Sequence, residues 1–423
     1  MKIKTRTVPL EYVLSLKPPK KKPLKKPSFL FQSLVRLLSI PDLRATQFTY
    51  TKERLEAAGK GPYLVLMNHS SFIDLKIASK ILYPKPYYIV STTDALVGKE
   101  WLMRKIGCIP TQKFTADVTL LKNMLQAVKE KNVSVLMFPE AGYSFDGRTT
   151  TLPRKLGQLL KKLDVPILTI ITEGAFLRQP LYNNLKLRKI KVSAHVNCLL
   201  TREEIAEKSV EELDAIIDKA FSFDNFKAQF ETKTVVDEPD RAEGLNRVLY
   251  RCPHCNAEGQ MYGEGAKLTC LKCGKAYELD VYGKLQAIEG ATEFSHIPDW
   301  FDWQRECVKK ELESDSYKLD LAVEIAVIAD YKAVYKVGKG RLVHTKDGFT
   351  LSGEDGKLLY EHSPLASYGL NADYDWYEMG DVICIGDKKR LYYCFPSVRD
   401  VVTKARFAAE EIYKRLKLSL AKE

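Results

Sequence analysis

Long apolar runs are missing from this 423-residue sequence. A helix that crosses a bilayer needs about 18–20 consecutive apolar residues. The best runs here, residues 63–67 and 165–171, have only the length of a strand. The N-terminus carries basic residues without an apolar core behind them, which argues against a secretory signal. We therefore expect an intracellular protein without a membrane-spanning helix.

Compositional bias is also missing, except in one segment. With 45% hydrophobic and 28% charged residues, the composition excludes disordered, collagen-like and disulfide-scaffold classes. The length suits two to four domains of about 100–200 residues. The net charge is +12, but residues 1–30 hold nine basic residues and one acidic one, so the other 393 residues contribute only +4. The excess charge is therefore local to the N-terminus.

An apolar pattern follows this basic segment. Four apolar residues recur at helical spacing within residues 27–40: Phe31, Leu34, Val35 and Leu38. A polybasic segment is attracted to anionic lipid by about 1 kcal/mol per Lys or Arg near the surface, although nucleic acid offers the same charge. We predict that residues 1–50 form a basic tail and an amphipathic membrane-anchor helix. The alternatives are a solvated, disordered tail and a helix that docks on the next domain.

A possible catalytic pair follows the apolar run at residues 63–67. His69 and Asp74 come directly after this predicted strand, at the end where open α/β sheets place their ligands. If a helix begins near Ser70, Asp74 can fold back and hydrogen-bond one nitrogen of the imidazole. The other nitrogen could then take a proton from a hydroxyl, which makes His69 a candidate general base oriented by Asp74. A purely structural histidine is the alternative.

A second block lies about 70 residues further on. The apolar run at residues 133–138 leads into Pro139-Glu140-Ala141-Gly142-Tyr143-Ser144, Lys113 follows the intervening Gly-Cys-Ile-Pro, and a Val-Pro pair occupies residues 165–166. In this order the blocks resemble the glycerolipid acyltransferase family typified by 1-acylglycerol-3-phosphate acyltransferase. That family has a His-x4-Asp block, a block ending in a basic residue, a Phe-Pro-Glu-Gly-Thr-Arg-Ser block and a Val-Pro block. The resemblance covers roughly residues 50–200.

The resemblance implies an α/β catalytic domain, which we place at residues 51–235. It implies transfer of a fatty acyl group from acyl-CoA or acyl carrier protein to the hydroxyl of 1-acyl-sn-glycerol-3-phosphate, in phospholipid biosynthesis. The hydroxyl would attack the thioester directly, so Cys108 is not needed as a nucleophile and behaves as a small hydrophobe. The substrate-binding residues that the resemblance implies are Lys113, Glu140, Gly142, Ser144 and Arg148.

Two departures from the family pattern bear on the acceptor. The family's Gly-Thr-Arg is Ala141-Gly142-Tyr143 here, so its arginine is missing, and Lys113 stands where the family usually has another arginine. Lysine offers phosphate a mobile point charge in place of a planar fork. Lys113 with Arg148 or Arg154 could still neutralise a phosphate. Equally, the acceptor could be a different lysophospholipid or a glycolipid.

Four cysteines follow a polar linker at residues 231–247. They form two Cys-x2-Cys pairs, with 14 residues between Cys255 and Cys270: Cys252, Cys255, Cys270 and Cys273. This spacing predicts a zinc ribbon at residues 246–286, whose four thiolates would close a tetrahedral, structural Zn²⁺ site. A non-enzymatic zinc-ribbon binding protein is therefore a rival hypothesis. The mixed charge of the ribbon and its lack of clustered aromatics argue against nucleic acid as a partner.

The remaining residues, 290–423, are predicted to be rich in β-structure. Residues 319–327 alternate as a half-buried strand, and Asp-Gly pairs indicate hairpins. A final helix is predicted after a cap at Ser397, and the arrangement resembles a pleckstrin-homology-type barrel. Taken together, the sequence predicts a peripheral enzyme on the cytoplasmic face of a membrane. Its expected partners are membrane lipids, an acyl-CoA or acyl carrier protein donor, and lysophosphatidate or another lysolipid.

Overall fold

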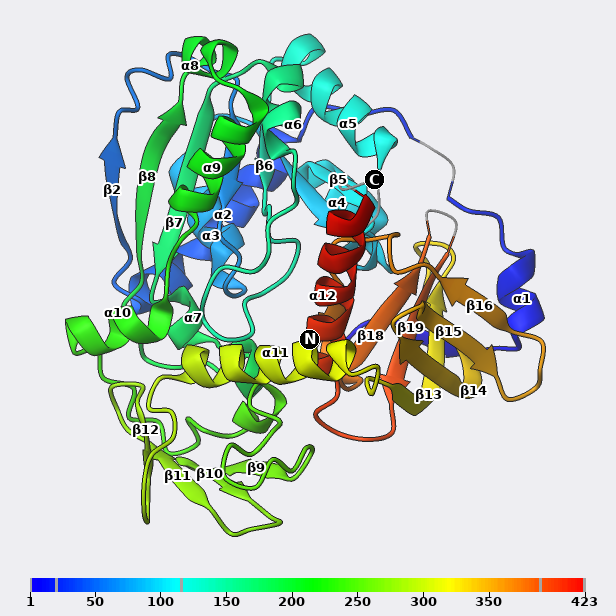
Figure 1. The fold of residues 1–423 in the computed structure, drawn as a ribbon. Coiled ribbons are helices and arrows are strands. Elements are labelled where there is room, and N and C mark those ends of the chain that lie inside the picture. The colour runs from blue at the N-terminus through cyan, green and yellow to red at the C-terminus, as the bar shows by residue number, and fades with distance from the viewer. Residues whose placement is uncertain (1, 20–21, 115–116, 388–389, 421–423) are drawn as a thin grey trace.

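The structure is a computed structural model that describes the chain except residues 1, 20–21, 115–116, 388–389 and 421–423. Within the described part, the strands form three sheets of seven, four and eight strands (Figure 1). Also in that part, none of the helices combines the length and the apolar character that crossing a bilayer requires.

The seven-stranded sheet belongs to the predicted catalytic region, and its order is β2-β8-β7-β3-β6-β4-β5. Its strands are β2 (Thr49–Glu53), β3 (Leu64–Met67), β4 (Tyr87–Thr92), β5 (Cys108–Thr111), β6 (Ser134–Met137), β7 (Ile167–Glu173) and β8 (Ser193–Leu200). The central strand β3 runs parallel to both β6 and β7, while β7 and β8 are antiparallel. All four residues of β3 are fully buried, as expected for a strand that is covered on both faces.

Helices cover both faces of this sheet, because alternate residues of β3 enter different cores. Leu64 and Leu66 pack in the cluster that includes α5 (Val118–Leu125), α6 (Leu156–Leu163), α8 (Arg202–Glu207) and α9 (Val210–Ala220). Val65 and Met67 pack in the cluster that includes α2 (Phe29–Ala45) and α3 (Ile73–Leu82). The short α4 (Glu100–Ile106) lies beside α2. The predicted α/β architecture of this region is confirmed.

The small sheet lies beside the cysteine pairs, and Cys270 is the last residue of its strand β10. Its antiparallel strands are β9 (Met261–Glu264), β10 (Lys267–Cys270), β11 (Ala276–Leu279) and β12 (Leu285–Ala287). The sheet packs against the long helix α11 (Ile297–Glu313), where the rings of Tyr277 and Trp300 meet edge to face at 5.0 Å.

The eight-stranded sheet forms the C-terminal unit, and its main order is β16-β15-β14-β13-β19-β18-β17. Seven of its eight strands are β13 (Leu319–Ile328), β14 (Val334–Thr345), β15 (Gly348–Gly353), β16 (Leu359–His362), β17 (Asn371–Asp373), β18 (Val382–Gly386) and β19 (Leu391–Pro396). Strands β16 and β17 lie at the two ends of this order, and no pairing among the described residues joins them to close the sheet. The β-rich unit with a terminal helix is therefore present, whereas the comparison with a pleckstrin-homology barrel stays a prediction.

The terminal helix α12 (Val402–Leu420) begins later than expected. The predicted cap at Ser397 is wrong, because the backbone N–H of Ser397 donates to the carbonyl of Ala322 and so continues the pairing of the sheet.

Part of the N-terminal basic segment is ordered. Residues Thr5–Thr7 form β1, which pairs in parallel with β14 of the C-terminal sheet. The short helix α1 (Leu10–Ser15) then buries Leu10 and Val13. The alternative of a solvated, disordered tail is therefore wrong for residues 5–15, because β1 pairs with β14 and α1 buries two apolar side chains.

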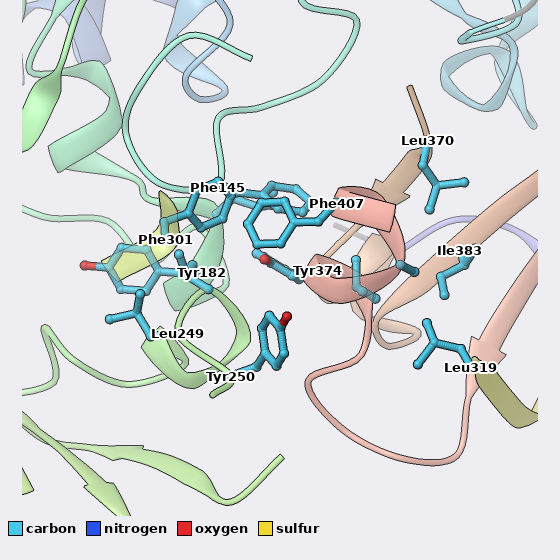
Figure 2. Packing of buried hydrophobic residues seen from close by; sticks show 14 of the residues in the cluster. Phe145, Tyr182, Leu249, Tyr250, Phe301, Leu319, Leu370, Tyr374, Ile383 and Phe407 are labelled. Carbon is cyan, nitrogen blue, oxygen red and sulfur yellow. The ribbon is translucent and has the colours of Figure 1, made fainter. Parts of the chain in front are cut away.

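One hydrophobic core joins the units along the chain (Figure 2). Phe145 of the catalytic region packs on Tyr374 with ring centroids 4.2 Å apart, and Phe301 of α11 meets Phe407 of α12 at 4.5 Å. Tyr250, just before the cysteine pairs, belongs to the same core. The C-terminal unit is thus held directly against the catalytic region.

Candidate active site

The central strand β3 delivers His69 to its C-terminal end, and α3 begins four residues later. Nδ1 of His69 lies 3.0 Å from Oδ2 of Asp74, in the first turn of α3. The same carboxylate oxygen accepts hydrogen bonds from the backbone N–H groups of Ser70 (2.7 Å) and Ser71 (3.0 Å). Asp74 is fully buried, so these donors fix its position. The structure therefore brings the predicted pair together in the expected geometry.

This contact decides which imidazole nitrogen is available. With Asp74 accepting from Nδ1–H, the lone pair on Nε2 is free to accept a proton. The His69 side chain retains 21% of its exposure, so it can meet a ligand. An arrangement of this kind can deprotonate a hydroxyl and stabilise the resulting imidazolium.

Two aromatic rings flank the imidazole, which sequence reasoning did not assign to the site. The centroid of His69 lies 4.1 Å from that of Phe138 and 4.2 Å from that of Tyr143. Tyr143 is one of the departures from the family pattern. Burial raises the pKa of Tyr143 well above its ordinary value, and the carboxylates of Asp74 and Asp373 raise it further. Tyr143 is therefore a neutral phenol whose ring lies beside the histidine.

Glu140 is buried behind the histidine. Its two oxygens accept from the backbone N–H groups of His69 (2.8 Å) and Thr150 (3.1 Å). Burial raises the pKa of Glu140 to about 8, against the lowering effect of these hydrogen bonds. The contacts in the structure thus tie Glu140 to the backbone of two loops. These contacts give Glu140 a role in positioning the two loops, in addition to the substrate contact that the resemblance implied.

Ser144 and Gly142 also lie next to this centre. The Ser144 N–H donates to the carbonyl of His69 (3.3 Å), and its hydroxyl donates to the carbonyl of Arg148. A Cβ placed on Gly142 would meet no atom within 4 Å, so this glycine borders open space. His69, Asp74, Glu140, Gly142 and Ser144 are thus brought to one end of the sheet.

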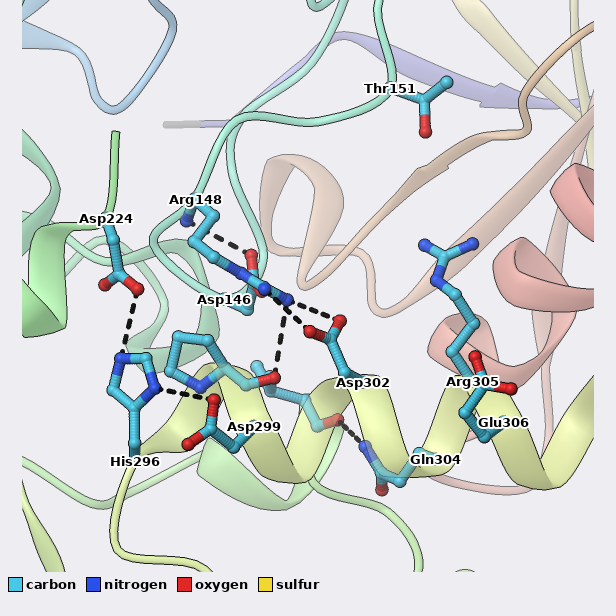
Figure 3. A network of polar contacts seen from close by, with 12 residues as sticks. Asp146, Arg148, Thr151, Asp224, His296, Asp299, Asp302, Gln304, Arg305 and Glu306 are labelled. Carbon is cyan, nitrogen blue, oxygen red and sulfur yellow. Dashed lines mark hydrogen bonds and ion pairs between the residues drawn. The ribbon is translucent and has the colours of Figure 1, made fainter. Parts of the chain in front are cut away.

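Arg148 is directed elsewhere. Its guanidinium pairs with Asp146 and, through two nitrogens, with Asp302 of α11 at 2.7 and 2.8 Å (Figure 3). Arg154 pairs with Asp218. Both arginines that sequence reasoning offered to a phosphate are therefore already bound to carboxylates.

Lys113 faces the C-terminal unit. It lines a small pocket with Asp94 and Trp376, and the indole N–H of Trp376 donates to Asp94 (3.3 Å). Burial raises the pKa of Asp373 on β17 to about 6, while the charge of Lys113 lowers it. The C-terminal unit therefore contributes side chains beside Lys113. No local pattern predicts this approach, because Lys113 and Asp373 lie 260 positions apart in the chain.

The four cysteines converge beside the small sheet, where Cys270 ends β10 and the other three lie in loops. Their Sγ atoms all lie within 4.8 Å of one another, with Cys252–Cys273 at 3.8 Å and Cys255–Cys270 at 3.7 Å. A tetrahedral zinc ion with Zn–S bonds of about 2.3 Å would hold its sulfurs about 3.8 Å apart. The predicted set is thus assembled and fits a metal ion.

Helix α2 has polar side chains among its buried residues and apolar side chains on its exposed face, which is the reverse of an ordinary surface helix. Its inward face carries Gln32, whose side chain donates to the carbonyls of Tyr87 (2.7 Å) and Ile106 (3.0 Å). Its outward face carries exposed apolar side chains: Phe29, Leu30, Leu34, Leu37 and Leu38. Trp101 and Leu102 of α4 are also exposed, and the ring of Trp101 meets Phe31 at 5.4 Å. We call the exposed side chains of α2 and α4 the apolar face.

Comparison with known proteins finds a family match for part of the chain. The model of the family described as "Acyltransferase" matches residues 47–173. Residues 47–173 of this chain are similar to the acyltransferase family. This match confirms the predicted resemblance to glycerolipid acyltransferases and the predicted enzyme class, an O-acyltransferase. The matched residues include His69 and Asp74 as well as the block around Glu140. Curated proteins gave no significant match.

A solved structure is also similar to part of this acyltransferase. It is the crystal structure of the 1-acyl-sn-glycerophosphate (LPA) acyltransferase PlsC from Thermotoga maritima. The two chains share 18% identity, and the similarity covers 49% of this chain and 81% of that chain, with a TM-score of 0.36.

Proposed function

We propose that this acyltransferase moves a fatty acyl group from a thioester to the hydroxyl of 1-acyl-sn-glycerol-3-phosphate. The donor would be acyl-CoA or acyl carrier protein. The observation that carries the proposal is the 3.0 Å contact between Nδ1 of His69 and Asp74, because it leaves Nε2 free at the end of the central strand. The family match at residues 47–173 supports the reaction class.

In this mechanism the acceptor hydroxyl donates its proton to Nε2 of His69 as its oxygen attacks the thioester carbonyl. The buried carboxylate of Asp74 stabilises the imidazolium. The backbone N–H groups of Ser70 and Ser71 in turn donate to this carboxylate and fix its position. When the tetrahedral intermediate collapses, the C–S bond breaks and the thiolate takes the proton from the imidazolium. The products are an ester and a free thiol, so no acyl-enzyme is formed.

The test presents one labelled acyl thioester to a panel of lysolipids and follows thiol release by purified full-length protein. His69→Ala should reduce the acceptor-dependent rate to background, because no other group takes the proton. The matched control is His195→Ala, since His195 is exposed on β8 and pairs with Glu53. An unchanged rate in His69→Ala would remove the proposal.

A different acceptor, a lysophospholipid or glycolipid without a phosphate monoester, is the second candidate. It is favoured by the pairing of Arg148 with Asp146 and Asp302, which occupies a cation that a phosphate would need. The same lysolipid panel separates the two, because a phosphate-binding site would rank lysophosphatidate first.

The four thiolates support a structural zinc site. Cys252, Cys255, Cys270 and Cys273 would complete the tetrahedron and leave no position for a substrate. When bound, a zinc ion would cross-link the two loops that carry the cysteine pairs. The ribbon would then brace α11, on which the sheet packs.

The apolar face supports a peripheral position on a membrane, on the cytoplasmic side as the sequence predicts. Lysines that precede α2 are exposed, among them Lys25 and Lys26. Apolar side chains beside exposed lysines suit an anionic lipid surface. Such a position would bring lysolipid acceptors directly to the enzyme.

A further inference from the structure

A polar cluster joins the loop at residues 145–151 to helix α11 (Figure 3). Two nitrogens of Arg148 in this loop, Nη1 and Nη2, donate to the two carboxylate oxygens of Asp302 at 2.8 and 2.7 Å. Its Nε donates to Asp146 at 2.8 Å, and Nη2 also reaches the carbonyl of Pro298 at 3.4 Å. All three guanidinium nitrogens therefore donate within the protein, and the forked contact with Asp302 fixes the direction of the side chain.

The N-terminus of helix α10 (Asn225–Thr232) contacts the same loop. The backbone N–H and the side-chain N–H₂ group of Asn225 both donate to the carbonyl of Gly147, at 3.0 and 2.6 Å. Asp224, the N-cap of this helix, forms an isolated antiparallel bridge with Arg148. Two helices therefore hold the same two neighbouring residues of the loop, Gly147 and Arg148.

His296 connects these two helices, because it lies between a carboxylate at the start of each. Its Nε2 lies 3.1 Å from Oδ2 of Asp224, and its Nδ1 lies 3.0 Å from Oδ1 of Asp299 in the first turn of α11. The contact with Asp224 raises the pKa of His296, burial lowers it and the contact with Asp299 raises it again, so the charged imidazolium is favoured overall. Six side chains make up the polar cluster: Asp146, Arg148, Asp224, His296, Asp299 and Asp302.

The loop that the polar cluster holds supports the main chain of His69 at both of its polar groups. The hydroxyl of Ser144 donates to the carbonyl of Arg148, and the N–H of Ser144 donates to the carbonyl of His69 at 3.3 Å. On the other side, Glu140 accepts from the N–H of Thr150 at 3.1 Å and from the N–H of His69 at 2.8 Å. One residue thus separates each polar group of the His69 main chain from the loop.

A general base must lie within hydrogen-bond reach of the proton that it takes, at about 2.6–3.2 Å. A displacement of about 1 Å, even from a change far from the reacting atoms, can lower a rate by about 100-fold. We infer that Asp302 is a positioning residue, which holds His69 in its catalytic position through Arg148. This inference rests on the proposed role of His69. It gives α11, which lies outside the matched residues 47–173, a part in the reaction.

The first test is Asp302→Asn in the full-length protein, because it keeps the size of the side chain and removes its charge. The melting temperature should change little, since Asp302 is half-exposed and an exposed ion pair contributes little to global stability. In the acceptor-dependent assay, kcat and kcat/KM should fall together by about tenfold. Asp302→Glu keeps the carboxylate and should recover most of this loss. The matched control is Glu306→Gln, one turn later on α11, where Glu306 is exposed and pairs with Lys309.

The second test is hydrogen–deuterium exchange, which needs no activity. In Asp302→Asn, peptides that contain His69 and Ser144 should exchange about fivefold faster, whereas peptides of α9 should exchange as in wild type. The inference is overturned if these peptides exchange as in wild type, or if Asp302→Asn keeps the wild-type kcat. It is also overturned if Asp302→Glu is as slow as Asp302→Asn. A wild type that acylates no lysolipid would refute the proposed function, and the exchange comparison alone would then decide whether Asp302 holds His69.

Discussion

Asp74→Asn is the most informative change at the catalytic site, because the structure defines what it removes. Oδ2 of Asp74 accepts from Nδ1 of His69 and from two backbone N–H groups. An asparagine can keep its carbonyl oxygen on the backbone donors, but it then turns an N–H₂ group towards the imidazole or loses the contact. Nδ1 would become the acceptor and Nε2 would carry the proton, so the base would be in the wrong tautomer.

The expected loss can be estimated from two effects. Removing the charge-assisted hydrogen bond to the imidazolium costs about 1.5–3 kcal/mol, or roughly 10- to 150-fold in rate. The wrong tautomer adds to this, and an equivalent change in a serine protease triad lowers kcat about 10⁴-fold. We therefore expect kcat to fall by about 10²–10⁴ with KM nearly unchanged, since neither effect touches the bound lysolipid.

The assay is acceptor-dependent thiol release under saturating thioester, with circular dichroism to check folding. Asp218→Asn is the matched control, because Asp218 is a surface partner of Arg154 on α9. A loss smaller than threefold for Asp74→Asn would refute the role of Asp74. So would an equal loss in the control.

Three further predictions concern other parts of the chain. Burial raises the pKa of Glu140 from 4.5 to about 8, so between these values the folded state binds a proton that the unfolded state releases. The contribution of Glu140 to the free energy of unfolding therefore falls as the pH rises from 5 to 8. Glu140→Gln should therefore be most destabilised relative to wild type at pH 5, and the gap should shrink by pH 8 in thermal unfolding; a gap independent of pH would contradict this. Cys273→Ser should lose bound zinc in elemental analysis and lower Tm, whereas Cys307→Ser, outside the cluster, should do neither; equal zinc content in both would contradict the site. Leu30→Glu with Leu38→Glu should reduce flotation with anionic vesicles at least tenfold, whereas Leu359→Glu, exposed on β16, should not, and unchanged flotation of the double variant would refute the membrane face.

The sequence predicted features that short segments determine. The buried strand at residues 64–67, the pair His69 and Asp74 beyond it, and the two Cys-x2-Cys pairs each lie within a few residues of chain, so periodicity and spacing were sufficient. The outward apolar face of α2 could also be predicted in part. The burial of Gln32 could not be predicted, because the two carbonyls to which its side chain donates lie far away in the sequence.

The features that the sequence missed depend on contacts between distant segments. The pairing of β1 with β14, the aromatic rings around His69 and the approach of β17 to Lys113 have no local signal. Arg148 shows the same difficulty, since its partner Asp302 lies 154 residues away on α11. Such contacts follow from how the three sheets pack, and no spacing rule describes that packing.

Single-turnover thiol release by the purified full-length enzyme, measured with and without lysolipid, tests the central claim most directly. If His69 activates the acceptor hydroxyl for direct attack, wild type should release thiol only when the acceptor is present, and His69→Ala should release none above background. A burst of thiol without acceptor, or release by His69→Ala at the wild-type rate, would contradict this account.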